Sequence, residues 1–518
     1  MLKPLPRPVA TLVAIILGSS LAACSFEPKL RVPQAPSDKT PYTAGQSPHK
    51  TVAPGGVAGQ AQQIEYGKEL HEEWWKLFRS KALDELIAVG LKNSPTIAAA
   101  QAQLKEAQAT ARANASIFYP QITGNLQANR SKATSASFGG SGGFDYSLIN
   151  GSVGVSYYPD IFGVNRLVYR NSKALVQYQR WELEAARLTL TGNIVTTAVS
   201  EAATEGQIKA TQSIIAQEKK LLQLTENQYQ AGAITYSTVM TQKSQLATEM
   251  ATLPPLEQQR AVYRHELAIL VGAFPANAKA QPFVLTDLRL PEHLPVSLPS
   301  QLLKQRPDIR AVLAQMEAAN ATIGEARAQF YPTVQLTASF GSAASHPDLF
   351  FNPISSIWSL VGAMSQPIFE GGKLEAQKSE AHAAYDVLYA NYRSTVLDAF
   401  DQVANALRAV EHDAQTLAAQ REAVAASAEA LKLAESSYRA GATDYLTLLT
   451  AEVQYDTARI AEIKAQSQRY QDTASLLVAL GGGWWNNPGV KTNAAHLLPI
   501  HAHKSLKPKP VPAAVTQP

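Results

Sequence analysis

The two halves of the sequence repeat each other at a distance of about 210 residues, and this duplication constrains the fold more than any other feature. Residues 227–239 read NQYQAGAITYSTV, and residues 436–448 read SSYRAGATDYLTL. Residues 118–120 and 330–332 both read FYP. A fixed internal period is a better guide to architecture than chain length, so we predict two copies of one elongated unit.

Two long stretches without proline predict the helical part of each copy. The first lies between Pro159 and Pro254 and the second between Pro367 and Pro488, and both are rich in the strong helix formers Ala, Leu, Gln, Glu and Lys. Each stretch also carries an apolar or aromatic residue at every seventh position, which is the period of a coiled coil. One such ladder alone fits a plain helical bundle equally well. The ladders are Ile208, Ile215, Leu222 and Tyr229 in one copy, and Leu417, Val424, Leu431 and Tyr438 in the other.

An Ala-Gly-Ala turn interrupts the helical pattern in both copies, at Gly232 and at Gly441. Glycine just after a helical stretch is a common helix stop, and the pattern resumes within a few residues. Each copy should therefore end in a helical hairpin whose tip is this turn. We also predict that Pro254 and Pro255 break the returning helix of the first copy, because proline disrupts a helix interior.

Four segments alternate polar and apolar residues with the period of a β-strand: residues 121–129, 152–158, 333–341 and 356–366. Their lengths fit transmembrane β-strands, although two surface hairpins packed on helices would show a similar pattern. Four strands cannot close a barrel by themselves, and an open strand edge is forbidden in lipid. If these strands span a membrane, several chains must complete the barrel.

The N-terminus has the pattern of a secretory signal. Lys3 and Arg7 precede the apolar run 9–17, which is too short to span a membrane. The residues Leu-Ala-Ala at 21–23 and then Cys24 follow this run. Cys24, the only cysteine of the chain, could be an ordinary buried thiol. The four residues resemble the lipobox of bacterial lipoproteins, which implies cleavage before Cys24 and covalent acyl chains, including palmitate, on it.

Composition separates the two ends of the chain from its body. Prolines among Gly, Ser and Thr in residues 24–65 predict an extended, lipidated tether, and we expect a flexible tail at residues 486–518. Between them, residues 66–295 form the first structural repeat and residues 296–485 the second. Residues 1–23 are the expected lipoprotein signal peptide.

Several motifs in a fixed order resemble those of TolC-type outer-membrane efflux proteins, in their lipoprotein (NodT-type) branch. The motifs are WWKLF at 74–78, LPPLE at 253–257, LPSQLLKQRPDIR at 298–310, AANATIGEARAQFYP at 318–332 and LGGGW at 480–484. They run from about Trp74 to Trp485, so the resemblance covers most of the chain.

This resemblance implies a mainly α-helical, mixed fold: a long coiled-coil barrel plus four transmembrane strands per chain. A homotrimer would complete one 12-stranded β-barrel in the outer membrane, with the helices extending into the periplasm. Its partners would be outer-membrane lipid, a periplasmic membrane-fusion adaptor docked at the hairpin tips Gly232 and Gly441, and an inner-membrane pump of the RND type. Transport through this component would be passive.

In this family the periplasmic tip is commonly closed by a ring of acidic residues just past the turns. A carboxylate ring would attract cations. The corresponding positions here are all threonine: Thr238, Thr241, Thr447 and Thr450. One hypothesis is a neutral, hydrogen-bonded gate. The other is that these threonines pack between helices and that the constriction lies elsewhere, at Asp444 or Glu452.

The sequence favours a channel over an enzyme. No phosphate-binding loop, HExxH motif or dinucleotide fingerprint is present, so we expect no catalytic residues and no cofactor besides the lipid on Cys24. The net charge of +4 is dispersed, which argues against a nucleic-acid partner. We predict no metal site, although His496, His501 and His503 in the tail leave a weak metal site open.

The leading hypothesis is the exit duct of a tripartite efflux pump for drugs or other toxic small molecules. The alternatives are a type I secretion duct, which would use the same fold, and a coiled-coil envelope lipoprotein without a pore. A scaffold of the last kind has no use for four alternating strands.

Overall fold

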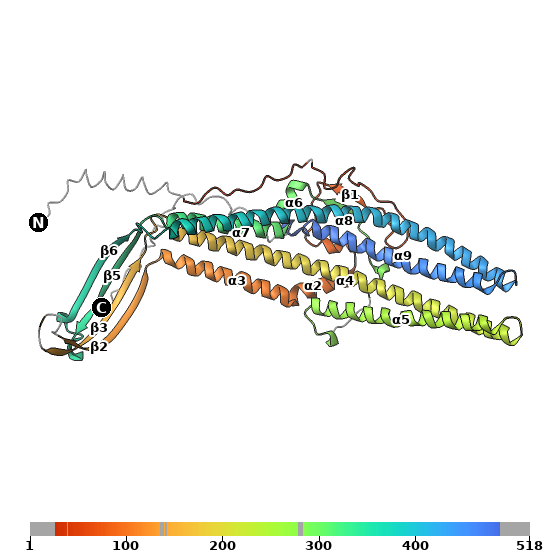
Figure 1. Ribbon diagram of the computed structural model, residues 1–518, viewed down its shortest axis with the longest axis horizontal. Coiled ribbons are helices and arrows are strands. Elements are labelled where there is room, and N and C mark those ends of the chain that lie inside the picture. Colours follow the sequence, from red (N-terminus) through yellow and green to blue (C-terminus); the bar gives the residue numbers. More distant parts are fainter. Residues whose placement is uncertain (1–25, 39, 135–138, 140–141, 278–282, 487–518) are drawn as a thin grey trace, which may run out of the picture.

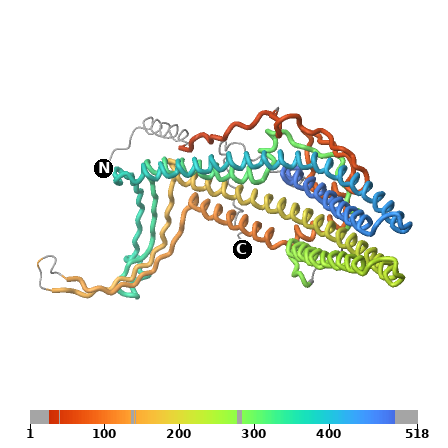
Figure 2. Tube along the Cα trace, turned by 45° about the vertical axis from the view of Figure 1, so that its right-hand side comes forward, coloured from red at the N-terminus to blue at the C-terminus, as the bar shows by residue number. Residues whose placement is uncertain are grey.

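The structure is a computed structural model that describes residues 26–38, 40–134, 139, 142–277 and 283–486. The expected signal peptide, Cys24 and the three tail histidines lie outside the described residues. Figure 1 shows a long bundle of helices with a four-stranded sheet at one end and two helical hairpin tips at the other. The sheet bends away from the direction of the helices, as the turned view of Figure 2 also shows.

The two proline-free stretches form helices of equal length, which confirms the predicted duplication. Helices α4 (Val164–Gln230) and α8 (Lys373–Arg439) each have 67 residues, and α5 (Tyr236–Leu270) and α9 (Tyr445–Ala479) each have 35. A 67-residue helix is about 100 Å long. The pairs α4/α5 and α8/α9 are the two predicted hairpins, and their tips lie at the same end of the molecule (Figure 1).

The predicted break in the first returning helix is wrong, because α5 continues through Pro254 and Pro255. Each proline removes one backbone N–H, which leaves the carbonyls of Met250 and Ala251 without their helical partners. Both of these residues are exposed, so water can bond the freed carbonyls. The helix therefore tolerates two prolines that a buried segment would not.

Shorter helices precede the strands in both copies. In the first copy these are α2 (Lys81–Asn93) and α3 (Pro95–Ala115), and in the second α6 (Pro299–Gln305) and α7 (Pro307–Ala328). Helices α3, α6 and α7 begin with proline, whose fixed φ angle suits the first helical position. Helix α7 packs against both α4 and α8, so it joins the two copies in the part of the bundle next to the sheet (Figure 1).

The four predicted strands all form, and they are paired in one antiparallel sheet. The order is β2 (Gln121–Thr134), β3 (Gly143–Tyr157), β5 (Thr333–Ala344) and β6 (Ser356–Ser365). Strand β3 begins well before the predicted residue 152, because Phe144, Tyr146 and Leu148 already alternate with polar residues and pair with β2. This earlier alternation has the opposite phase to that of residues 153–157, so the prediction missed it. Strands β2 and β6 are the two edges of the sheet and have no partner on their outer sides within the described residues.

The N-terminal segment is packed along the helices, which corrects the predicted tether from residue 26 onward. Thr43, Thr51, Ala58 and Gln62 are buried. The segment ends in β1 (Gln63–Tyr66), which pairs in parallel with β4 (His293–Val296) of the linker between the two copies.

Three arginines of α8 and α9 hold this segment through its backbone carbonyls. A proline-rich chain has few intrachain partners for its carbonyls, and a guanidinium group supplies several donors at fixed angles. The bonds run from Arg408 to the carbonyls of Ala44 and Gln46, from Arg421 to that of Val57, and from Arg469 to those of Ala58 and Gln60. Composition predicted extension correctly, but it could not show these donors.

Most of the buried apolar side chains lie in the middle of the bundle. One cluster surrounds Trp74 and Phe78. The ring of Phe78 contacts the rings of Trp74 and of Tyr470 in α9. A second cluster gathers around Leu302, Ile309 and residues of α8. Within the part of the chain that the structure describes, no helix combines the length and apolarity needed to cross a membrane.

Candidate functional site

The two hairpin tips are formed by the same turn with the same hydrogen bonds. Gly232 and Gly441 adopt φ angles of 75° and 70°, in the left-handed region that favours glycine. After each glycine, an alanine donates its backbone N–H to a carbonyl five residues earlier, over 2.9 Å. A Cβ added to either glycine would have no other atom within 4 Å, so both tips are open to solvent and to a partner.

The four threonines predicted as gate residues lie in the first two turns of the returning helices. The hydroxyl groups of Thr241 and Thr450 donate to the carbonyls of Ser237 and Leu446 in their own helices. Thr238 lies in the first turn of α5 and Thr447 in the first turn of α9. Among the described residues of one protomer, no hydrogen bond joins a threonine of the first hairpin to one of the second. The role of these threonines as a gate stays a prediction.

Asp444 caps helix α9. Its carboxylate accepts the backbone N–H of Thr447 over 2.9 Å and the hydroxyl of the same residue over 2.6 Å. These two hydrogen bonds lower the pKa of Asp444. The equivalent residue of the first copy is Thr235, which makes no side-chain bond to the backbone of α5. Within the protomer Asp444 therefore acts as a helix cap, and its role in a constriction stays a prediction.

A tyrosine joins the two hairpins one turn above the tips. The hydroxyl of Tyr438 in α8 donates to the side-chain carbonyl of Gln228 in α4 over 2.8 Å. The ring of Tyr438 also lies 6.1 Å from the ring of Tyr445 in α9. The repeat-equivalent Tyr229 is instead exposed and makes a ring contact only within its own hairpin, with Tyr236.

Above this bridge, a carboxylate and an amide are buried between α4 and α5. Glu218 is 3% exposed and Gln242 is 0% exposed. The amide nitrogen of Gln242 donates to the carboxylate of Glu218 and, over 3.4 Å, to its backbone carbonyl. The amide oxygen of Gln242 has no hydrogen-bond partner in the part of the chain that the structure describes. Burial raises the pKa of Glu218, against the opposing effect of the bond from Gln242.

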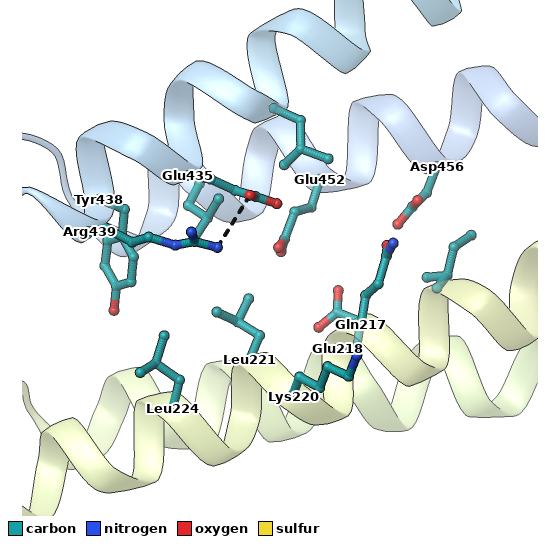
Figure 3. Close-up of a pocket in the computed structure, with 13 residues that line it drawn as sticks. Gln217, Glu218, Lys220, Leu221, Leu224, Glu435, Tyr438, Arg439, Glu452 and Asp456 are labelled. Carbon is teal, nitrogen blue, oxygen red and sulfur yellow. Dashed lines mark ion pairs between the residues drawn. The ribbon is translucent and has the colours of Figure 1, made fainter.

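Two more carboxylates face Glu218 from helix α9 across a cavity of about 250 Å³ between the hairpins. Figure 3 shows Glu452 and Asp456 pointing from α9 toward the space that Glu218 and Gln217 of α4 enter from the other side. Burial, and then the charge of Glu218, raises the pKa of Glu452 to about 8. Burial, and then the charges of Glu249 and Glu218, raises the pKa of Asp456 to about 7.

A second cavity of about 510 Å³ continues from this one away from the tips, between α4, α5 and α9. Glu249 of α5 and Asp456 of α9 both line it. We refer to Glu218, Glu249, Glu452 and Asp456 as the carboxylate seam. The seam follows the interface between the two hairpins from the level of Glu218 upward.

Sequence reasoning named Glu452 only as an alternative constriction and missed the other members of the seam. A signal was present, since each member departs from the internal repeat. The residues at the equivalent positions carry no acid: Ser427 for Glu218, Ala458 for Glu249, Lys243 for Glu452 and Ala247 for Asp456. Positions where two copies of a duplication differ in charge are therefore candidates for function.

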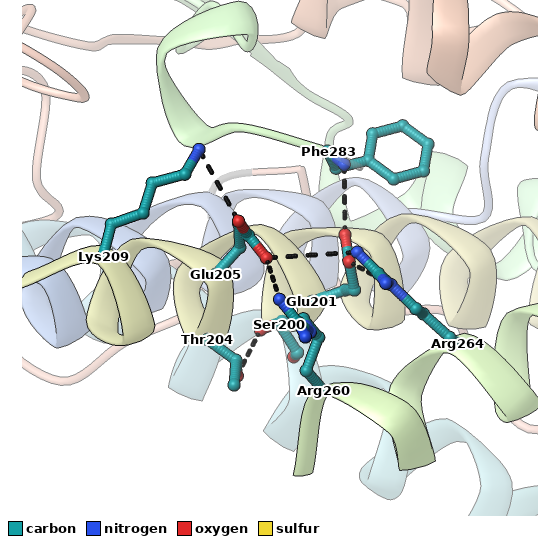
Figure 4. Close-up of polar contacts among 8 residues, drawn as sticks. All are labelled: Ser200, Glu201, Thr204, Glu205, Lys209, Arg260, Arg264 and Phe283. Atoms are coloured by element: carbon teal, nitrogen blue, oxygen red, sulfur yellow. Dashed lines mark hydrogen bonds and ion pairs between the residues drawn. The ribbon is translucent and has the colours of Figure 1, made fainter. Parts of the chain in front are cut away.

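Higher in the bundle, a network of ion pairs fastens the first hairpin to the linker (Figure 4). Glu201 is 1% exposed and pairs with Arg264 over 2.9 Å, while its second oxygen accepts the backbone N–H of Phe283. Glu205 pairs with Arg260 over 2.7 Å. Burial by itself would raise the pKa of Glu205, but the bond from Arg260 and the neighbouring positive charges lower it. Glu201 and Glu205 thus have arginine partners, whereas none of the four seam acids has an ion pair among the described residues.

No group of three or more His, Cys, Asp or Glu side chains in the described ranges is arranged to hold a metal ion. The seam acids lie along the interface and do not converge on one point. The arrangement at the tips is therefore that of two joined hairpins with an acidic interface, without a coordination sphere.

A model of the outer membrane efflux protein family matches residues 86–273 and 298–482, one segment in each copy of the repeat. A pyoverdine export outer membrane protein of Pseudomonas putida is 31% identical over 482 residues, which cover 90% of this chain and 96% of the relative. A toluene efflux pump outer membrane protein of the same species is 29% identical over 484 residues, covering 92% and 95%.

Solved structures give the same result for the fold. The outer-membrane channel OprN superimposes with a TM-score of 0.81 at 26% identity, covering 89% of this chain and 100% of that one. The outer membrane protein VceC of Vibrio cholerae has a TM-score of 0.75 at 27% identity, covering 80% and 100%. Both matches therefore cover most of the chain and the whole of the channel protein compared with it.

Proposed function

The chain belongs to the outer membrane efflux protein family, and from this premise we propose how it is anchored, assembled and joined to its pump. The protein is an outer-membrane efflux channel, the exit duct through which small molecules leave the cell. The single observation that carries this conclusion is the match of the family model to both copies of the repeat, together with channel structures that share the whole fold. The energy for transport would enter elsewhere, since transport through a duct is passive.

We propose that three chains assemble around one pore. The four-stranded sheet supports this, because its edges β2 and β6 are unpaired and open edges are not tolerated in lipid. Twelve strands from three chains would close the barrel, and six hairpins would line the tube below it. The near equality of the two copies lets a three-fold assembly present six similar hairpin tips.

The test of this assembly is the mass and conductance of the purified full-length protein. We expect native mass spectrometry to show a trimer, and planar bilayers containing it to show discrete single-channel steps. A monomer, or a trimer that never conducts at any voltage or pH, would contradict the duct. A conducting trimer that restores efflux of a toxic small molecule in a deletion strain would favour the efflux duct over a type I secretion duct, which is expected to restore export of a protein.

The hairpin tips are the proposed docking site for a periplasmic membrane-fusion adaptor, and through it for an inner-membrane RND-type pump. Gly232 and Gly441 are exposed and formed alike, so one adaptor surface could engage both. A photo-crosslinking residue at Ala233 or Ala442 should capture the adaptor in cells. The same residue at Glu375, at the other end of α8, is the matched control and should not.

We propose that Cys24 carries the lipid anchor of the mature chain in the outer membrane. The packed segment runs from residue 26 onward along α8 toward the middle of the bundle. Mass spectrometry of the N-terminal peptide should show an acylated Cys24, and Cys24→Ser should remove the lipid while leaving the trimer able to form. An unmodified thiol in the wild-type protein would contradict the anchor.

The threonines at the start of α5 and α9 are the proposed neutral gate. A Thr450→Asp substitution would place three carboxylates at the tip of a trimer and should increase cation selectivity in planar bilayers. Thr450→Val, which removes the hydroxyl without adding charge, is the control and should leave ion selectivity unchanged. If Thr450→Asp also leaves it unchanged, Thr450 does not line the constriction.

A further inference from the structure

The interface between the two hairpins carries acid on both walls. Glu218 approaches it from the first hairpin, and Glu452 and Asp456 approach it from the second (Figure 3). Glu249 of the first hairpin lines the neighbouring cavity. The repeat supplies none of these acids twice, as shown above. Four independent departures from the repeat thus converge on one interface, which is not expected if each were a neutral surface change.

Among the described residues, no seam acid has an ion pair, and Glu218 and Glu249 accept only amide hydrogen bonds, from Gln242 and Gln245. One carboxylate oxygen of Glu452 is buried without a hydrogen-bond donor, and so is the amide oxygen of Gln242 beside Glu218. A buried ionised carboxylate is costly unless it is paired, and the group takes up a proton instead. In Figure 4, by contrast, Glu201 and Glu205 are matched by arginines.

Charged and titratable groups of α4, α8 and α9 face the seam, and they do not neutralise it; from α5 the only such group lining the two cavities is Glu249 itself. Lys220 of α4 and Lys464 of α9 line the two cavities, and Arg459 of α9 lowers the pKa of Asp456 only partly. Arg439 of α8 is paired with Glu435 over 3.6 Å. The remaining titratable groups at the seam are the phenols of Tyr438 and Tyr445, which carry no charge at neutral pH.

We propose that the carboxylate seam is a proton-dependent latch between the two hairpins: protonated, it lets them stay packed, and ionised, it drives them apart. The inference rests on the proposed function, in which the hairpin tips form the closed end of the duct. It adds a condition for opening, namely that the acids between the hairpins lose their protons. The Tyr438–Gln228 bridge lies between the seam and the tips, so separation at the seam would also break this bridge.

The direction of the pH dependence follows from the raised pKa values. The packed state binds more protons than the separated state, in which the acids would titrate near their ordinary values of 4.5 for Glu and 3.8 for Asp. Packing is therefore favoured below the ordinary values and loses that advantage as the pH rises through about 7 for Asp456 and about 8 for Glu452. The hairpins should be closed in acid and should separate in mild alkali.

The experiment measures the distance between the two tips of the full-length protein in lipid bilayers. Spin labels at Ala233→Cys and Ala442→Cys occupy equivalent, exposed tip positions, and mass spectrometry checks that Cys24 carries no label. Electron paramagnetic resonance should give a longer distance at about pH 9 than at about pH 5. Glu452→Gln with Asp456→Asn mimics the protonated seam and should hold the short distance at both pH values.

Glu226→Gln is the matched control, since Glu226 is an exposed acid of α4 two turns from Glu218. It should keep the wild-type response. A tip distance that is the same at both pH values in the wild type would overturn the latch. The latch would also be overturned if the Glu452→Gln, Asp456→Asn variant showed the same pH-dependent change in tip distance as the wild type.

Conductance separates this inference from the proposed function. For the wild type we expect an open probability at least about tenfold higher at about pH 9 than at about pH 5, and a flat profile for the double variant. If the tip distance responds to pH but conductance does not, the latch stands and the tip is not the gate. If the trimer conducts with a flat pH profile and a constant tip distance, the channel stands and the latch is wrong.

Discussion

The two hairpins have the same backbone and different interiors. Helices α4 and α8 are equally long, as are α5 and α9, and both tips use the same glycine turn. The first hairpin, however, buries Glu218, Gln242 and Thr225, where the second has Ser427, Ala451 and Ala434. Duplication has thus preserved what the tube needs, which is length and turn geometry. The two copies have diverged at the positions where they meet each other.

The same contrast holds for a pair of equivalent arginines. Arg260 in α5 and Arg469 in α9 occupy the same place in the repeat. Arg260 is partly exposed and pairs with Glu205, whereas Arg469 is 0% exposed and binds the N-terminal segment. One copy uses this arginine within its hairpin, and the other uses it to hold a distant part of the chain.

The largest effect is expected from these arginines. Arg469→Met should destabilise the protein by about 3 kcal/mol or more, because it leaves the buried carbonyl of Ala58 and the partly buried carbonyl of Gln60 without donors. Arg260→Met should cost about 1 kcal/mol or less, since its ion pair is partly solvated. Thermal unfolding of the two variants in detergent checks the difference. Equal losses would show that the N-terminal segment contributes little.

A smaller effect is expected when the buried pair of the first hairpin is changed to the residues of the second. Gln242→Ala alone should cost about 2 kcal/mol, because it removes the donor to the buried Glu218. Adding Glu218→Ser should recover part of this loss, since the unpaired acid is then gone. The four proteins form a double-mutant cycle whose coupling is read from thermal unfolding. Additive losses would mean that the two side chains do not interact.

We expect the two tips to respond alike when their glycines are replaced. Gly232→Ala and Gly441→Ala each place a Cβ on a left-handed residue, at a cost of about 1 kcal/mol. The strain should appear as faster hydrogen exchange in the last turn of α4 or α8, by the same factor in both variants. If hydrogen exchange accelerates by clearly different factors in the two variants, the two tips are held differently in the assembled protein.

The smallest effect concerns the helix starts, where Asp444 faces its equivalent Thr235. Asp444→Ala should speed hydrogen exchange in the first turn of α9, and Thr235→Ala should change α5 less, because only Asp444 accepts the backbone N–H. The pKa of Asp444 is lowered, so its contribution is present above the ordinary value of 3.8 and is lost as the pH falls through the lowered one. Protection of this turn should therefore be constant at neutral pH and decrease only in strong acid.

Much of the fold could be predicted because it depends on local pattern. Long runs without proline indicated the four main helices, alternation located the four strands, and a glycine after a heptad ladder marked each tip. The end of a strand was less certain: the prediction began β3 at residue 152, although Phe144, Tyr146 and Leu148 alternate in the opposite phase and belong to the same strand. Pro254 and Pro255 were misjudged because their effect depends on the exposure of the preceding turn.

The candidate site was only partly accessible to the same reasoning. The register of the repeat located Thr238, Thr241, Thr447 and Thr450 at the tips, and the family resemblance suggested their role. It could not pair Glu218 with Gln242, or bring Asp456 opposite Glu218, because those relations join different helices. A comparison of the two copies for differences in charge would have named the seam acids, although not their common interface.

The sequence by itself therefore determined the duplicated architecture, the hairpins and the strands, since each arises from residues near one another in the chain. Only the tertiary structure decided which side chains lie between the hairpins and what the N-terminal segment binds. These depend on how two long helical pairs pack, and burial then sets their chemistry. A glutamate on a helix is ordinary in sequence, and it becomes a proton-binding group only when another helix covers it.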